Sequence, residues 1–169
     1  MPLASPQNLY ERVYRSATGA GYVDVHPAHG TQELAANLAI AIELANRGEA
    51  VCLLPVVEGS KNLDATRNGL PWEFKTPVTA NAKTALQRHV SDASAQGATR
   101  VLVLLNRRMT LDGVIAGLKL AFLPERAKKI TDLCLLLPNG DLLSFRVAQM
   151  RAPHAFIKAL KNRGGGQLQ

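Results

Sequence analysis

Apolar side chains recur along the chain at spacings that alternate between those of helices and those of buried strands. Leu34, Leu38, Ile42 and Ala45 lie three or four residues apart, which predicts an amphipathic helix over 31–47. Short, continuously apolar runs elsewhere are typical of strands covered on both faces. The other expected elements are strands at 50–54, 101–105 and 133–137, helices at 80–96, 110–122 and from Pro153 onward, and a short helix at 8–15.

The Asn68-Gly69 step is the sharpest turn signal in the chain. Asn-Gly favours a type I′ turn, because both central residues of that turn need a positive φ. If these two residues form the loop of a hairpin, Asp64 and Glu73 oppose each other in a non-hydrogen-bonded pair, with Cα atoms about 4.5 Å apart. Lys75 lies two residues beyond Glu73 and therefore projects from the same face of the strand.

Two carboxylates that face each other on a sheet repel, so their placement needs a physical explanation. At a separation of about 5 Å and an effective dielectric constant of about 20, their repulsion is roughly 3 kcal/mol. A divalent cation between Asp64 and Glu73 would reverse the sign of that interaction, and Mg²⁺ and Mn²⁺ prefer carboxylate oxygen ligands. A neighbouring Lys75 would orient or deprotonate a water, a combination that suits metal-assisted phosphodiester hydrolysis. A solvated salt-bridge cluster on a surface hairpin is the alternative.

The order of these elements predicts one α/β domain with a mixed central β-sheet flanked by helices. A second Asn-Gly step, within 138–141, predicts a hairpin that joins the strand at 133–137 to a partner strand at 142–147. The expected boundaries are 25–163 for the domain, 1–24 for an N-terminal extension and 164–169 for a flexible tail.

The composition is that of a soluble globular domain, with 47% hydrophobic and 20% charged residues. No apolar run approaches the ~20 residues that span a bilayer, so no membrane partner is expected. Cys52 and Cys134 lie in apolar runs, which indicates buried thiols and a reducing compartment. The first residues lack the pattern of a signal peptide, so we expect a cytoplasmic location.

The net charge of +7 is unevenly distributed. Residues 1–99 hold 8 Lys and Arg against 9 Asp and Glu, whereas residues 100–169 hold 12 against 4. A basic excess confined to one part of a chain suits a polyanionic partner, nucleic acid first. A solvated basic surface that aids solubility is the alternative.

Asp64, Glu73-Phe74-Lys75 and the preceding Glu33 helix resemble the PD-(D/E)XK nuclease superfamily. The residue before Asp64 is Leu63, where that superfamily usually has Pro. More narrowly, roughly 25–106 resembles the C-terminal nuclease domains of bacterial contact-dependent growth-inhibition toxins. The matching features are Ala-Asn-Arg-Gly at the end of the first helix, the apolar run Val-Cys-Leu-Leu-Pro after it, the acidic hairpin ending in Lys-Thr, and a helix ending near Gln96.

This resemblance implies a restriction-endonuclease-like core and a metal-dependent nuclease. In the toxin group the substrate is frequently tRNA, and an immunity protein holds the enzyme inactive. The resemblance favours RNA over DNA, with Mg²⁺ or Mn²⁺ as cofactor. It implies that Glu33, Asp64 and Glu73 hold the metal and that Lys75 completes the catalytic set.

Several polar residues are candidates for contacts to nucleic acid or water. Arg suits phosphate because its fork of donors binds two oxygens at once. The candidates for nucleic-acid contact are Lys61, Thr76, Asn106, Arg107 and Arg108, and those for a role in binding phosphate, orienting water or transferring protons are His26, His29, His89, Gln87 and Gln96. Each is also readily explained as an ordinary surface or loop residue.

Two other classes of function compete with a nuclease. One is a catalytically inactive nucleic-acid-binding or phage structural module that keeps the fold. The other is an interaction domain whose basic half binds an acidic partner protein. The nuclease is favoured because Asp64, Glu73 and Lys75 are all present at the required spacing.

Overall fold

The structure is a computed structural model that describes residues 9–151 and 154–163. The strands pair in the order in which they occur in the chain, and both parallel and antiparallel pairs are present. The expected α/β class, a mixed sheet flanked by helices, is confirmed. The chain forms two compact units, one ending at Trp72 and the other beginning at Glu73, so the division falls within a single strand.

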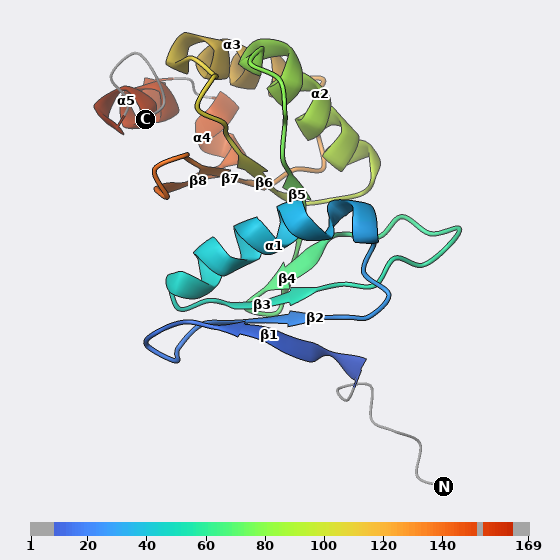
Figure 1. The fold of residues 1–169 in the computed structure, drawn as a ribbon. Coiled ribbons are helices and arrows are strands. Elements are labelled where there is room, and N and C mark those ends of the chain that lie inside the picture. The colour runs from blue at the N-terminus through green and yellow to red at the C-terminus, as the bar shows by residue number, and fades with distance from the viewer. Residues whose placement is uncertain (1–8, 152–153, 164–169) are drawn as a thin grey trace, which may run out of the picture. The chain divides into compact units, whose positions relative to one another are not determined.

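The first unit is a sheet with one long helix. Its strands are β1 (Glu11–Arg15), β2 (Tyr22–Val25), β3 (Ala50–Leu53), β4 (Ala65–Arg67) and the first half of β5 (Leu70–Lys75). The helix α1 (Thr31–Asn46) connects β2 to the parallel β3 and lies along one face of this sheet (Figure 1). Ile40, Ala41, Leu44 and Ala45 of α1 are fully buried. Of the stripe predicted from spacing, only Ala45 is among them; Leu34, Leu38 and Ile42 are half-buried, so the packed face is rotated from the predicted one.

Gly21 allows α1 to pack closely against the start of β2. A Cβ atom at this position would lie 1.7 Å from the carbonyl oxygen of Ala45, a separation at which two atoms cannot coexist. The glycine is therefore required by the close approach of the helix backbone, and not by its own dihedral angles.

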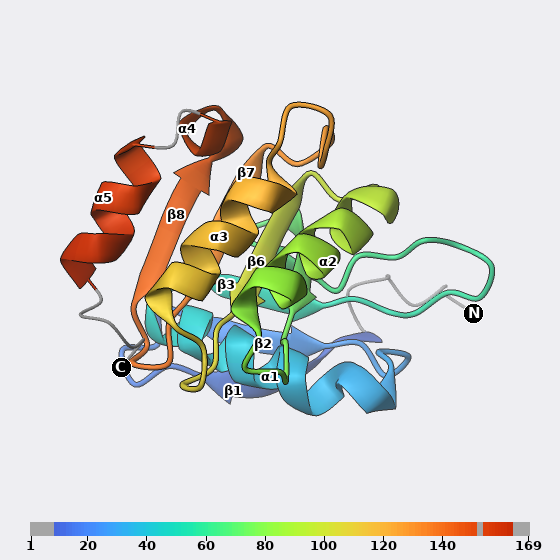
Figure 2. The same cartoon turned by 90° about the horizontal axis from the view of Figure 1, so that it is seen from above.

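The second unit combines the rest of the sheet with four helices. Its strands are the second half of β5, β6 (Arg100–Leu104), β7 (Asp132–Leu136) and β8 (Leu142–Arg146), and its helices are α2 (Ala82–Ala95), α3 (Leu111–Ala121), α4 (Val147–Arg151) and α5 (His154–Arg163). Figure 2 shows α2 and α3 side by side over β6 and β7. Successive residues of β6 and β7 are buried, which explains why these strands appear in the sequence as continuous apolar runs.

Most predicted elements are confirmed within one or two residues at each end, and the errors concentrate near the two ends of the chain. The expected helix at 8–15 is wrong over its described part, where β1 pairs antiparallel with β2, a strand that was not expected. A helix of that length is marginal in isolation, whereas a strand gains backbone hydrogen bonds from its neighbour. The short α4 was also not expected. Pro153, the expected first residue of the last helix, and the expected tail of 164–169 lie outside the described residues.

Candidate functional site

The Asn68-Gly69 turn fixes the register of β4 and β5 as predicted. Both residues have a positive φ, 48° and 83°, as a type I′ turn requires. Arg67 pairs with Leu70, Thr66 with Pro71 and Ala65 with Trp72. The ladder ends there, one step before the expected pair of Asp64 and Glu73, so these two acids are the covalent neighbours of its last pair. From Glu73 onward, β5 pairs with β6.

Glu73 and Lys75 share one face of β5, as their spacing predicts. The Glu73 side chain is only 3% exposed, and Lys75 Nζ donates to its Oε1 at 2.6 Å. Lys75 Nζ also donates to Oε1 of Gln96, the residue that caps the end of α2, at 3.2 Å. The ammonium group is therefore held between a buried carboxylate and a side-chain amide.

His89 lies on the same face of α2 as Gln96, two helical turns earlier. Burial lowers the pKa of His89, and the positive charges of Arg88 and Lys75 lower it further, while Asp92 acts in the opposite direction. Lys75 is therefore one of the positive charges that disfavour the imidazolium form of His89.

Replacing Lys75 with Met is expected to raise the pKa of His89, because it removes one of the positive charges that disfavour the imidazolium form. The measurement is an NMR titration of the His89 ring protons. Lys83→Met serves as the matched control, since Lys83 is an exposed cation on the same helix. Equal pKa values in the wild type and in Lys75→Met would contradict the arrangement described here.

Asp64 precedes β4 and is contacted by a buried amide from α1. Asn37 Nδ2 donates to Asp64 Oδ1 at 3.4 Å, and the same nitrogen lies 3.2 Å from Nε2 of His29. The other ring nitrogen of His29 lies 2.6 Å from the carbonyl oxygen of Leu54, whose own N–H donates to the carbonyl of Asp64. His29 is thus a buried, hydrogen-bonded residue, and two successive hydrogen bonds, through Asn37, connect it to Asp64.

Asn37 is a site residue that the sequence analysis missed. It is 4% exposed and lies on the buried stripe of α1, three residues before Ile40 and four before Ala41. A single amide in an otherwise apolar helical stripe was the available signal, because a buried amide needs partners. Glu33 lies one turn before Asn37 and therefore on the same side of α1, where its side chain is exposed.

The residues after β6 hold the loop that follows β5 in place through hydrogen bonds to its backbone carbonyls. Asn106 Nδ2 donates to the carbonyls of Pro77 and Thr79, at 3.1 and 2.9 Å. The Arg108 guanidinium donates to the carbonyl of Val78, and its backbone N–H donates to Asn106 Oδ1 at 3.1 Å. Asn106 and Arg108 therefore have structural partners, which residue type alone did not reveal.

The remaining candidates for nucleic-acid contact differ in exposure. Arg107 and Lys61 are exposed. Thr76, directly after β5, has a buried hydroxyl for which the described residues supply no hydrogen-bond partner. Of the histidines, His26 accepts at Nδ1 from the N–H of Ala28, at 3.0 Å, and so acts in the local turn.

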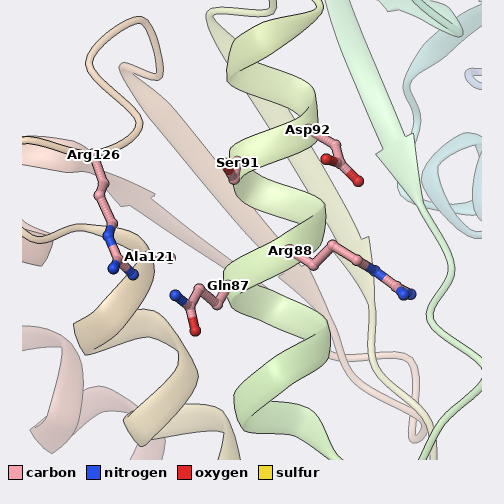
Figure 3. Close-up of a pocket in the computed structure, with 6 residues that line it drawn as sticks. All are labelled: Gln87, Arg88, Ser91, Asp92, Ala121 and Arg126. Atoms are coloured by element: carbon pink, nitrogen blue, oxygen red, sulfur yellow. The ribbon is translucent and has the colours of Figure 1, made fainter.

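A shallow pocket of about 270 Å³ lies against α2, lined by four of its residues together with Ala121 and Arg126. Figure 3 shows that, of the residues lining it, Gln87 and Ser91 lie on the side of α2 that faces Arg126, and Arg88 and Asp92 on the side away from Arg126. Gln87 and Gln96 are nine residues apart, which places them on opposite sides of the helix. The structure therefore separates these two candidates, and only Gln96 contacts Lys75.

Among the helices that the structure describes, none combines the length and the apolar character needed to cross a membrane.

Comparison with known proteins gives a likeness in structure but not in sequence. No family model matches the sequence, and no curated protein matches it. Among solved structures, a chain of the "CdiA-CT/CdiI toxin and immunity complex from Burkholderia pseudomallei" is similar, with a TM-score of 0.54 and 22% sequence identity. The match covers 69% of the present chain and 86% of that chain. The comparison therefore shows a fold like that of a chain in this toxin and immunity complex.

Proposed function

We propose that this protein is a metal-dependent nuclease of the PD-(D/E)XK type that hydrolyses nucleic-acid phosphodiester bonds. The observation that carries the proposal is the pairing of buried Glu73 with Lys75 on one face of β5. A nearly buried carboxylate at 2.6 Å from an ammonium group is costly to desolvate, so its retention calls for a chemical role. Asp64 and Glu73 are the covalent neighbours of Ala65 and Trp72, the last pair of the β4–β5 ladder, which supports their assignment as the two acids of the expected motif.

The donor set suits Mg²⁺ or Mn²⁺. Such ions are commonly held by one or two carboxylates, with water and substrate phosphate completing the octahedron. In the described part of the chain, no three His, Cys, Asp or Glu side chains gather as a ready-made cage. Asp64 and Glu73 would be the protein ligands, and Glu33 would assist through water. The cation would supply charge to the phosphate and lower the pKa of a bound water.

The chain's own residues would then orient the reactants. Lys75, held by Glu73 and Gln96, would direct its remaining N–H toward an attacking water or a phosphate oxygen. His89, whose pKa is lowered by burial and by the charges of Arg88 and Lys75, would be the candidate proton acceptor. Lys61 and Arg107, which are exposed, would contact the nucleic-acid backbone, and the basic excess of the residues beyond 100 would add to the attraction; the buried hydroxyl of Thr76 does not suit such a contact.

We further propose that the protein acts as a toxin domain on RNA, with tRNA as the substrate class, and is restrained by an immunity protein. The similar solved structure is a toxin and immunity complex, which supports the toxin role and the immunity partner. RNA is favoured over DNA by the family resemblance of the acidic hairpin. The action would take place in the cytoplasm of a target cell.

The test is incubation of the purified protein with total tRNA and with plasmid DNA in Mg²⁺, Mn²⁺ or chelator. We expect cleavage of tRNA that requires the metal and that Asp64→Asn abolishes. Glu43→Gln, which neutralises an exposed carboxylate of α1, is the matched control and should cleave as the wild type does. Binding of tRNA without cleavage in every metal would contradict the nuclease and favour an inactive nucleic-acid-binding module.

A further inference from the structure

His29 and Asn37 form a hydrogen-bonded chain that ends at Asp64. The chain runs from the carbonyl oxygen of Leu54 to His29 Nδ1 at 2.6 Å, from His29 Nε2 to Asn37 Nδ2 at 3.2 Å, and from Asn37 Nδ2 to Asp64 Oδ1 at 3.4 Å. His29 and Asn37 are 6% and 4% exposed, respectively. All these groups belong to the first compact unit.

The direction of each hydrogen bond follows from the chemistry of its ends. A carbonyl oxygen only accepts, so His29 Nδ1 carries the proton, and in the neutral ring Nε2 is then an acceptor. Asn37 Nδ2 has two hydrogens, one for His29 Nε2 and one for Asp64 Oδ1. If the amide were turned around, its oxygen would face two acceptors, so His29 sets the orientation in which Asn37 donates to Asp64.

We propose that His29 and Asn37 are positioning residues that hold the Asp64 carboxylate in its ligand orientation. This inference rests on the proposed function, in which Asp64 binds the cation. Groups that hydrogen-bond a metal-ligating carboxylate fix its direction, and their removal typically weakens metal binding by about 10–100-fold. This task explains why His29, just before α1, and Asn37, on the buried face of α1, are both buried.

The alternative explanation is that His29 has a purely structural role. In that case His29 stabilises the fold through its hydrogen bond to the carbonyl of Leu54, and its hydrogen bond to Asn37 has no effect on Asp64. Two amide substitutions separate the views. His29→Gln reaches the position of Nε2 and keeps an acceptor for Asn37, whereas His29→Asn keeps the donor to Leu54 at the position of Nδ1 and loses that acceptor.

The experiment measures Mn²⁺ binding by paramagnetic resonance titration and the Asp64 rotamer by NMR Hα–Hβ couplings. We expect Asn37→Leu and His29→Asn to weaken Mn²⁺ binding about 10–100-fold and to average the Asp64 couplings over several rotamers. His29→Gln should retain wild-type behaviour in both readouts. The Glu43→Gln control should also match the wild type.

The opposite ranking would overturn the inference. If His29→Asn binds Mn²⁺ as the wild type does and His29→Gln does not, His29 acts through Leu54 and not through Asn37. If the wild type itself binds no Mn²⁺, the proposed metal site fails, and the Asp64 couplings decide the positioning alone. Couplings unchanged in His29→Asn and Asn37→Leu would then refute it, and averaged couplings would sustain it.

Discussion

Glu73→Gln is expected to abolish metal-dependent cleavage and to lower the affinity for Mn²⁺. The substitution keeps the shape of the side chain and removes the negative charge that would hold the cation and that now pairs with Lys75. Loss of one preorganised electrostatic contact in an active site typically costs about 10²–10³-fold in rate, and a metal ligand should cost at least as much. Initial rates of tRNA cleavage and a Mn²⁺ titration measure the effect.

The ion pair makes a second variant necessary, because Glu73→Gln also removes the partner of a mostly buried ammonium group. Breaking one side of a buried pair destabilises a protein by about 3–5 kcal/mol, whereas replacing both sides with neutral groups is often tolerated. Glu73→Gln/Lys75→Met should therefore recover stability in urea unfolding while remaining inactive. Recovery of cleavage in the double variant would refute the catalytic role of the pair.

Gly21→Ala is expected to have the largest effect on stability, about 4 kcal/mol or more, the range reached when a new atom cannot be accommodated. The added methyl group would lie 1.7 Å from the carbonyl oxygen of Ala45, which belongs to the backbone of α1 and cannot rotate away. The helix would have to shift from the sheet, which would uncover Leu44 and Ala45. Urea unfolding and circular dichroism measure the loss.

Gly19→Ala is the matched control for this prediction. Gly19 lies in the same β1–β2 connection and has a positive φ of 75°, but a Cβ there would meet no atom within 4 Å. Its substitution should cost only the strain of a left-handed alanine, about 1–2 kcal/mol. Equal losses at the two glycines would show that the contact with Ala45 does not limit stability.

The features that could be predicted from the sequence depend on local geometry. The Asn68-Gly69 turn has few solutions, so the pairing of Thr66 with Pro71 follows from counting residues away from it. The period of a strand likewise places Glu73 and Lys75 on one face without any knowledge of the rest of the fold. The bounds of α1 and β3 followed from apolar spacing in the same way.

The features that could not be predicted depend on contacts between distant segments. Asn37 and Asp64 are 27 residues apart, and only the packing of α1 against the sheet brings them together. The structural bonds of Asn106 to the carbonyls of Pro77 and Thr79 are equally non-local. β1 was mistaken for a helix because neither β1, with three charged residues, nor its partner β2, which contains Asp24, forms a continuous apolar run.

The position of β1 also bears on how the protein behaves at high concentration. Among the described strands, β1 pairs only with β2, so its other edge presents backbone donors and acceptors that another molecule could extend. The register of its pairing with β2 shifts between Arg12 and Tyr14. Three of its five residues, Glu11, Arg12 and Arg15, are charged. An interrupted, charged edge is a poor template for intermolecular strand addition, which protects the folded protein against aggregation through this sheet.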